Sequence, residues 1–351
     1  MDTPEVNTVP AQKKCIKKRK TLIIIAAAVA ATIVACVLPF VASTADSTQT
    51  VYIYPDMTQA AFADSLRAKF GDSYTGKILF LNHIKPTDLA NRVGAYEIRK
   101  GTPAVKAWRK LHSGAQTPVK FTFNSVRTLS DFADKVDRTL LISRDEIFSA
   151  LTNPDTCAKY GFTPQTIPAM LLPDTYEFYW TAKPSTILKK MKEGYDNYWT
   201  KERLKKAQKL ELSPVQVSTL ASIVEEESAN RAERGTIARL YMNRLHKGMK
   251  LQSDPTVKFA VGDTKLQRIT GKHLFTNSPY NTYRVQGLPP GPIRLPEKQT
   301  LNAVLDAPQN DYIYMCAKED FSGTHNFTDN YADHRRNASR YQQELNRRGI
   351  K

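Results

Sequence analysis

The longest apolar run of the sequence lies close to its N-terminus. Residues 22–42 are almost entirely apolar, and no charged residue occurs from Thr21 to Ala45. About 20 apolar residues are enough to cross the hydrocarbon core of a bilayer as a helix. The pattern therefore predicts a transmembrane helix over residues 22–42, preceded by a tail over residues 1–21 and followed by a small, polar tether over residues 43–50.

The charges flanking this run predict its orientation. Six basic residues precede it and none follows it closely: Lys13, Lys14, Lys17, Lys18, Arg19 and Lys20. Positive charge is retained on the cytoplasmic side, so the tail is expected inside the cell and everything after Ser43 outside. Two alternatives share the same features, a cleaved signal peptide and a lipoprotein cleavage box that ends at Cys36.

Short elements of alternating type follow the tether. Alternation and helical spacing predict a strand, two helices, a strand, a helix and a strand, over residues 51–55, 58–70, 85–94, 95–98, 102–114 and 119–126. These elements predict a small α+β module over residues 51–130.

From residue 129 on, the sequence pattern predicts helices followed by loops. Two short helices are predicted over residues 129–140 and 144–153, and a Lys-rich amphipathic helix over residues 184–210. Ser213-Pro214 then begins a helical segment that reaches Lys247 with one break near Asn230, because Ser caps a helix and Pro suits its first turn. From Gly248 on, the abundance of Pro, Gly, Tyr and Asn predicts loops, where binding residues concentrate.

Composition narrows the possible partners. The chain carries 51 basic and 34 acidic residues, a net charge of +17, which suits anionic lipid or an anionic wall polymer. Nucleic acid is not expected, because most of the chain is predicted to lie outside the cytoplasm. The six His are scattered and only four Cys occur, so neither a metal site nor a cofactor is expected, and Cys157 and Cys316 are expected to be free thiols.

Three consecutive acidic residues, Glu225, Glu226 and Glu227, lie at the end of a predicted helix. Val217, Leu220, Ala221 and Val224 form the buried face of that helix, as their spacing shows. A helix C-terminus disfavours anions, and neighbouring carboxylates repel one another, so at least one of the three should have a raised pKa. A carboxyl that stays protonated near neutral pH can act as a general acid, although a bare triplet is more often a solvated helix end.

Several ordered blocks around this triplet resemble the endolytic murein transglycosylase family (YceG-like). They are SIVEEES, ARLYMNRLHKGMKLQSDPT, SPYNTYRVQGLPPGPI and GTHNFTDNYADH, and the resemblance covers most of residues 160–345. The resemblance implies a mixed α+β protein with one N-terminal transmembrane helix, a LysM-like module and a helical, loop-rich catalytic domain over residues 131–351. It also implies a bacterial protein of the cytoplasmic membrane whose catalytic part is extracellular or periplasmic.

The resemblance also implies site residues. Glu225 aligns with the family's catalytic acid/base, and Glu227 matches a second recurrent acidic position. The blocks that line the family's glycan groove match Gln252, Asp254, Tyr280, Asn281, Tyr283, His325 and Phe327. Their amide, carboxylate, imidazole and aromatic groups suit a sugar. Gly287 to Ile293 (GLPPGPI) is expected to be a rigid structural loop.

The implied reaction cuts the bond between N-acetylmuramic acid and N-acetylglucosamine within peptidoglycan strands and leaves 1,6-anhydro ends. Peptidoglycan strands are then the substrate, and peptidoglycan synthases are candidate partners. Two other functions remain open: a muramidase that uses Glu225 with Glu227 or Asp254, and a non-catalytic peptidoglycan-binding scaffold.

The chain departs from the family pattern at two places. Glu226 stands where the family usually has a basic residue between the two acids. Arg294, Leu295 and Glu297 stand where small or polar residues are more common, which is expected to alter contacts at the rim of the groove.

Overall fold

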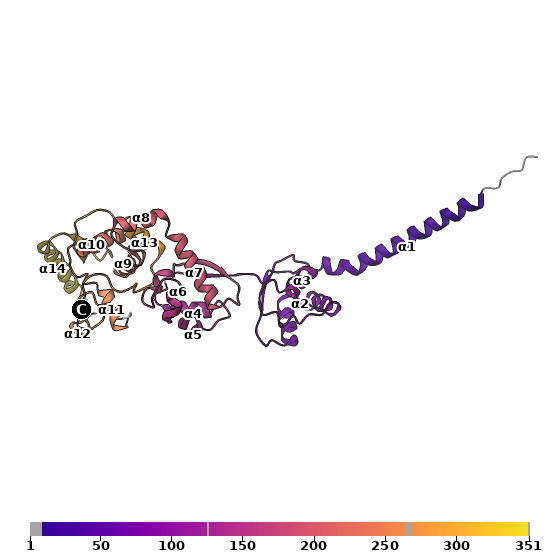
Figure 1. The fold of residues 1–351 in the computed structure, drawn as a ribbon, viewed down its shortest axis with the longest axis horizontal. Helices are drawn as coiled ribbons and strands as arrows, with labels where there is room; N and C mark the ends of the chain where they lie inside the picture. The colour runs from indigo at the N-terminus through magenta and orange to yellow at the C-terminus, as the bar shows by residue number, and fades with distance from the viewer. Residues whose placement is uncertain (1–8, 125, 264–265, 267–268, 350–351) are drawn as a thin grey trace, which may run out of the picture. The chain divides into compact units, whose positions relative to one another are not determined.

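The computed structural model describes residues 9–124, 126–263, 266 and 269–349, and the chain divides into two compact units, Met1–Pro118 and Val119–Lys351. Figure 1 traces the chain with its helices labelled. The N-terminal unit contains α1 (Val9–Ala42), β1 (Gln49–Ile53), α2 (Gln59–Ile84), β2 (Gly94–Ile98) and α3 (Ala104–Ser113).

The apolar run forms part of one long helix, α1. Its segment Arg19–Ala42 is long and apolar enough to cross a membrane, and it has no buried residue. This agrees with the span expected over residues 22–42. Residues 1–8 of the expected basic tail lie outside the described part of the chain.

The segment expected to be a tether is bound to the module instead. Ala45 is buried, its N–H donates to the carbonyl of Thr102 at 3.0 Å, and the carbonyl of Ser43 accepts from the N–H of Ala104 at 2.9 Å. Thr44 forms an isolated bridge with Pro103. Small side chains let this backbone approach closely, so composition alone did not distinguish a docked segment from a free one.

The module is built on an antiparallel pair, in which Val51 of β1 lies opposite Tyr96 of β2. Between the strands, α2 bends at Gly71, where φ is 76°. The predicted helix over residues 58–70 is the half of α2 before Gly71, the half after Gly71 was not predicted, and the prediction of a helix over residues 85–94 is wrong. Pro86 disfavours a helical conformation in the residue before it and supplies no N–H to a helix.

The boundary between the units lies at Pro118 rather than at residue 130. The strand β3 (Val119–Phe123) pairs with β4 (Asp174–Phe178), so it belongs to the C-terminal unit. Phe121 and Phe123 are buried in the core of that unit. The pairing joins residues about fifty positions apart, which a local pattern does not reveal.

The C-terminal unit is mainly helical, and besides the β3–β4 pair it contains a hairpin of β5 (Tyr314–Ala317) and β6 (His325–Thr328). Its α-helices are α4 (Leu129–Asp137), α5 (Arg144–Thr152), α6 (Pro154–Lys159), α7 (Pro184–Tyr198), α8 (Lys201–Lys209), α9 (Pro214–Glu227), α10 (Arg234–His246), α11 (Asp254–Val261), α12 (Gly271–Leu274), α13 (Lys298–Leu305) and α14 (Tyr331–Arg347). Two 3₁₀ turns span Ile167–Met170 and Arg231–Glu233.

Two expectations for this unit need correction. The Lys-rich helix is divided into α7 and α8, because Thr200 caps a new helix there. The part after Gly248 does not consist only of loops, since it contains α11 to α14 and the β5–β6 hairpin. The C-terminal helix α14 has no buried residue, so it lacked the apolar stripe that predicts a helix.

Helix α9 lies at the centre of the unit. A capping box between Ser213 and Gln216 begins it, with Pro214 in the first turn, and residues 217–225 are buried without interruption. Helices α10, α11 and α13 all contact it. Its predicted start and buried face are confirmed, and its last turn carries the three glutamates.

Candidate active site

The last turn of α9 sends its three acidic side chains into different surroundings. Glu225 is buried, whereas Glu226 and Glu227 are partly exposed. Successive residues of a helix point about 100° apart, so three neighbours cannot share one environment. Each of the three carboxyls therefore has its own set of partners.

Glu227 faces a pocket and is held from one side. Its Oε1 accepts hydrogen bonds from Tyr241 Oη at 2.6 Å and from Ser253 Oγ at 2.5 Å. Among the described residues, no hydrogen-bond donor engages Oε2. Burial raises the pKa of Glu227, and the bonds from Ser253 and Tyr241 only partly oppose that rise. Glu227 thus has the raised pKa expected of at least one glutamate in the triplet, but its main cause is burial rather than the helix end or the neighbouring glutamates.

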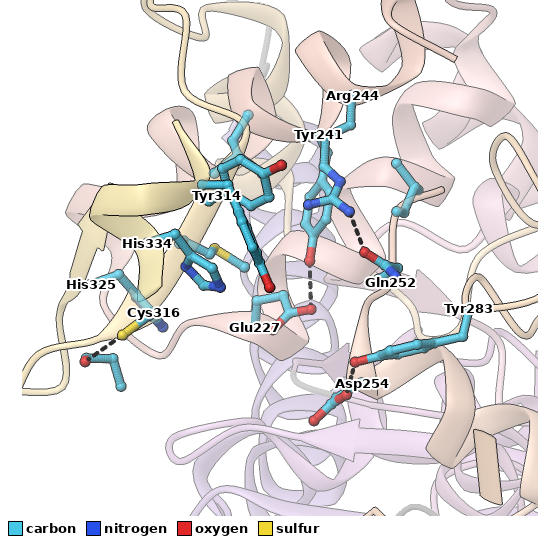
Figure 2. Close-up of a pocket in the computed structure, with 15 residues that line it drawn as sticks. Glu227, Tyr241, Arg244, Gln252, Asp254, Tyr283, Tyr314, Cys316, His325 and His334 are labelled. Atoms are coloured by element: carbon cyan, nitrogen blue, oxygen red, sulfur yellow. Dashed lines mark hydrogen bonds between the residues drawn. The ribbon is translucent and has the colours of Figure 1, made fainter. Parts of the chain in front are cut away.

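The pocket in front of Glu227 has a volume of about 520 Å³. It brings together five residues expected at the site: Glu227, Gln252, Asp254, Tyr283 and His325. Figure 2 shows Glu227 between the histidine side of the pocket and the pair formed by Asp254 and Tyr283. These side chains come from α9, the start of α11, the loop after α12 and the β5–β6 hairpin.

The polar walls of the pocket are fixed by mutual hydrogen bonds. Tyr283 Oη donates to Asp254 Oδ1 at 2.6 Å, and burial together with this bond raises the pKa of Tyr283. Gln252 Oε1 accepts from Arg244 at 2.6 Å, in a backbone with φ of 53°. A positive φ is strained for a residue other than glycine, and such strain is found at functional sites.

His325 is oriented by an acidic residue from the 3₁₀ turn before α10. Its Nδ1 lies 3.0 Å from Glu233 Oε2, and its backbone N–H donates to Glu233 Oε1 at 2.9 Å. The carboxyl of Glu233 thus fixes both the ring and the main chain of His325. The His325 ring in turn lies near enough to lower the pKa of Glu227.

Glu225 lies outside this pocket, within a group of donors. Its Oε1 is 3.0 Å from Arg294 Nη2, and its Oε2 accepts from Thr300 Oγ1 at 2.6 Å and from the Glu297 N–H at 2.9 Å. Arg234 is 3.8 Å from the same Oε2. Both oxygens are engaged by protein, which is the environment of a structural ion pair. This geometry does not fit the acid/base role expected for Glu225.

Three further predicted residues lie apart from the pocket lining. Asn281 is fully buried and donates to the carbonyls of Leu274 and Thr276, which is a structural role. Tyr280 packs on Phe259 with ring centroids 4.7 Å apart and lines a different hollow. Phe327 packs behind His325 at 6.1 Å between ring centroids.

The GLPPGPI loop has the structural role expected of it. A Cβ on Gly291 would lie 1.9 Å from the carbonyl oxygen of Gln165. Ile293 is buried, and its N–H donates to Ser222 Oγ at 3.0 Å. The loop is therefore seated against both α9 and the segment before the first 3₁₀ turn.

Several pocket residues were not predicted from the sequence, among them Tyr241, Arg244, Tyr314 and His334. Glu233, which orients His325, was not predicted either. Tyr241 and Arg244 lie one turn apart on α10, a helix whose buried face includes arginines. Charged residues on the buried face of a predicted helix are a signal that could have identified them. In the described part of the chain, no three His, Cys, Asp or Glu side chains are arranged to hold a metal ion. Cys157 and Cys316 are free thiols.

Comparisons with known proteins place the chain beside one family. A family model described as the YceG-like family matches residues 51–340. The chain is 30% identical over 269 residues to the endolytic murein transglycosylase of Bacillus subtilis strain 168, covering 71% of this chain and 73% of that protein. It is 26% identical over 232 residues to the protein of the same name from Streptococcus pneumoniae strain D39, covering 62% of this chain and 40% of the relative.

A solved structure shows the same fold. The crystal structure of a YceG-like protein from Listeria monocytogenes superposes with a TM-score of 0.55 at 26% identity. The match covers 83% of this chain and 98% of that one. Since the family model matches residues 51–340, most of the chain, the chain belongs to the YceG-like family.

Proposed function

We infer that the protein is an endolytic murein transglycosylase, which cuts the bond between N-acetylmuramic acid and N-acetylglucosamine within peptidoglycan strands. Two relatives carry that name. The observation that carries the inference is Glu227, a carboxyl with a raised pKa in a pocket of sugar-compatible side chains. A general acid must hold its proton near neutral pH, and burial supplies that condition here.

Glu227, rather than Glu225, is the acid/base of this proposal. Both of its hydrogen-bond donors use Oε1, which leaves Oε2 for the substrate. Glu225 has both oxygens occupied by Arg294, Thr300 and the backbone of Glu297. The two acids are two residues apart on α9, so the sequence pattern is compatible with either one.

In the proposed reaction, protonated Glu227 donates its proton to the oxygen that links the two sugars. The bond from that oxygen to the muramyl anomeric carbon breaks, and its electron pair stays on the leaving oxygen. The Glu227 carboxylate then takes the proton of the muramyl C6 hydroxyl, whose oxygen bonds to the anomeric carbon. The 1,6-anhydro ring forms without water, and Glu227 is again protonated.

The other pocket residues support this chemistry. Tyr241 and Ser253 fix the orientation of the Glu227 carboxyl. Asp254 lies in the same pocket, and its negative charge favours positive charge that develops on the sugar ring in the transition state. Aromatic faces such as those of Tyr283 and Tyr314 suit the apolar face of a pyranose.

A muramidase is the second candidate, because Glu227 and Asp254 line one pocket and a hydrolase needs two carboxyl groups. The two reactions differ in their products, since hydrolysis adds a water and leaves a reducing end. A non-catalytic scaffold would bind strands without shortening them.

The test is mass spectrometry of peptidoglycan incubated with the full-length protein in detergent and with its Glu227→Gln variant. Anhydro-ended fragments from the wild type alone support the transglycosylase. Reducing-ended fragments would replace it with the muramidase, and intact strands that remain bound would replace it with the scaffold.

The N-terminal unit fits an anchored enzyme. One apolar N-terminal helix is compatible with a single-pass membrane anchor. The basic flank favours a cytoplasmic N-terminus and an exported catalytic unit. The order β1, bent α2 and β2 supports a LysM-like interpretation of the module. An interaction with peptidoglycan synthases stays a prediction.

A further inference from the structure

Beside the catalytic pocket, arginine and glutamate side chains alternate in one continuous series of ion pairs. Arg127 lies 2.6 Å from Glu226, which lies 2.7 Å from Arg294, and Arg294 contacts Glu225 at 3.0 Å. Arg234 continues the series from Glu225 at 3.8 Å to Glu297 at 3.2 Å, and Arg231 ends it at 3.1 Å from Glu297. We refer to these seven residues as the arginine–glutamate series: Arg127, Glu226, Arg294, Glu225, Arg234, Glu297 and Arg231.

The series is buried in its middle and open at its ends. The Glu225 side chain is 2% exposed and that of Arg234 8%, whereas those of Arg127 and Arg231 are 45% and 63% exposed. A buried ion pair stabilises a fold only when its geometry and hydrogen bonds compensate the loss of water. The buried middle of the series therefore has a structural role, and the exposed guanidinium groups at its two ends are accessible to a ligand.

The ends carry unused binding capacity. Four arginines face three glutamates, so the series has one positive charge in excess. Arg127 and Arg231 each contact one acidic residue, and among the described residues each uses only Nη2 for that contact. A guanidinium has five N–H donors, and a planar anion with two oxygens can take two of them at once.

Both ends line the same hollow. It has a volume of about 780 Å³, opens to solvent, and is lined by the whole series together with Ala229 and Asn230. Glu226 belongs to this hollow, and Glu227, the next residue of α9, belongs to the catalytic pocket. The hollow and the pocket therefore lie on different sides of one helical turn, within about 10–12 Å of helix diameter.

We propose that this hollow binds a carboxylate of the peptide stem that branches from the muramyl residue of the strand being cut. The proposal rests on the proposed function. A stem of four or five residues reaches roughly 13–18 Å when extended, which exceeds the width of the helix that separates the two sites. One carboxylate also balances the one excess charge of the series.

The charge pattern disfavours a polyanion as the occupant. A chain of phosphodiesters would bring repeated negative charge past Glu226 and Glu297, which are 18% and 20% exposed on the same hollow. Like charges at short distance repel, so the series accepts a single carboxylate better than a run of phosphates.

The test compares peptidoglycan strands with intact stems and the same strands after an amidase has removed the stems. The full-length wild-type protein in detergent is measured beside the double variant Arg127→Gln/Arg231→Gln. Glu226 keeps Arg294 and Glu297 keeps Arg234 in this variant, so the buried middle of the series is left paired. Arg67→Gln is the matched control, because Arg67 is also an exposed, ion-paired arginine but lies in the N-terminal unit.

We expect the wild type and Arg67→Gln to cut strands with stems at a kcat/KM about tenfold or more above bare strands, as charge-assisted hydrogen bonds predict. The double variant should lose this preference while its rate on bare strands stays unchanged. A double variant that keeps the preference would overturn the proposal and leave the proposed function intact.

Two further outcomes also decide against it. Stem-free strands that carry a phosphodiester polymer could show the arginine-dependent preference, which would assign the hollow to phosphate. A wild type that cuts neither kind of strand would remove the proposed function, and the stem site with it.

Discussion

Replacing Glu225 and Glu227 separately by glutamine should separate stability from catalysis. In Glu225→Gln, the buried guanidinium of Arg294 loses an ionic partner 3.0 Å away, and Arg234 loses one at 3.8 Å. Arg294 keeps Glu226 at 2.7 Å and Arg234 keeps Glu297 at 3.2 Å, so neither guanidinium is left unpaired, and the loss is that of hydrogen bonds to a charged group, about 1.5–3 kcal/mol. For a unit of this size, each kcal/mol lowers Tm by roughly 2–4 °C, so Tm should fall by roughly 3–12 °C.

In Glu227→Gln, the fold should be almost unaffected. A glutamine oxygen can still accept from Tyr241 and Ser253, whose bonds both end on Oε1. No charged partner is left unpaired, so Tm should stay within about 2 °C of the wild type. Cleavage should fall by about 10²–10⁴-fold or more, because the only proposed proton donor is removed.

The assay pairs thermal unfolding, followed by circular dichroism of the full-length protein in detergent, with product mass spectrometry well below the lower Tm. Glu225→Gln should still produce anhydro-ended fragments per folded molecule. An inactive Glu225→Gln with wild-type Tm, beside an active Glu227→Gln, would refute the assignment and return the acid/base role to Glu225.

Two other predictions concern the pKa of Glu227, and a third concerns the packing of Gly291. Because burial raises the pKa of Glu227 above 4.5, folding binds a proton, so the free energy of unfolding should decrease as pH rises from 4.5 through the raised value. Denaturation against pH should show this decline in the wild type and not in Glu227→Gln. Tyr241→Phe removes a bond that lowers this pKa, so the alkaline limb of the kcat–pH profile should move to higher pH, and a shift to lower pH would contradict the argument. Gly291→Ala should cost more than about 3 kcal/mol in denaturant unfolding, because its Cβ meets the Gln165 carbonyl at 1.9 Å, whereas Gly76→Ala, with nothing within 4 Å, should not destabilise the protein.

Features fixed by neighbouring residues could be predicted from the sequence. The apolar run of α1 and the capped start of α9 at Ser213 depend on local spacing and cap chemistry, and both were found where the pattern predicts them. Features that depend on distant partners could not be predicted. The docking of Ser43 to Ala45 on residues 102–104 and the pairing of β3 with β4 arise from contacts across more than fifty positions.

For the candidate site, too, some features could be predicted from the sequence and others could not. Sequence blocks correctly grouped Gln252, Asp254, Tyr283 and His325 near the acidic triplet, since these residues line one pocket. The blocks could not separate a residue that faces the pocket from one that supports it, so Asn281 was expected in the groove although it is fully buried.

The local sequence pattern also could not show which of the two acids, Glu225 or Glu227, faces the pocket. A helix turns by about 100° per residue, so Glu225 and Glu227 face directions about 160° apart at the end of α9. What each carboxyl meets is decided by segments far along the chain: residues 294–300 reach Glu225, and Tyr241 and Ser253 reach Glu227.

This division gives the two sides of one helical turn complementary tasks. On one side, ion pairs engage both oxygens of Glu225 and fix the end of α9 against α13 and the 294–297 loop. On the other side, Glu227 has two neutral donors and a raised pKa, and among the residues that the structure describes no cation contacts its carboxyl directly. A general acid must be held in a fixed position, and its pKa must not be lowered by a nearby cation. Arg294 and Arg127 are paired with Glu225 and Glu226 instead, an arrangement compatible with the acid role proposed for Glu227.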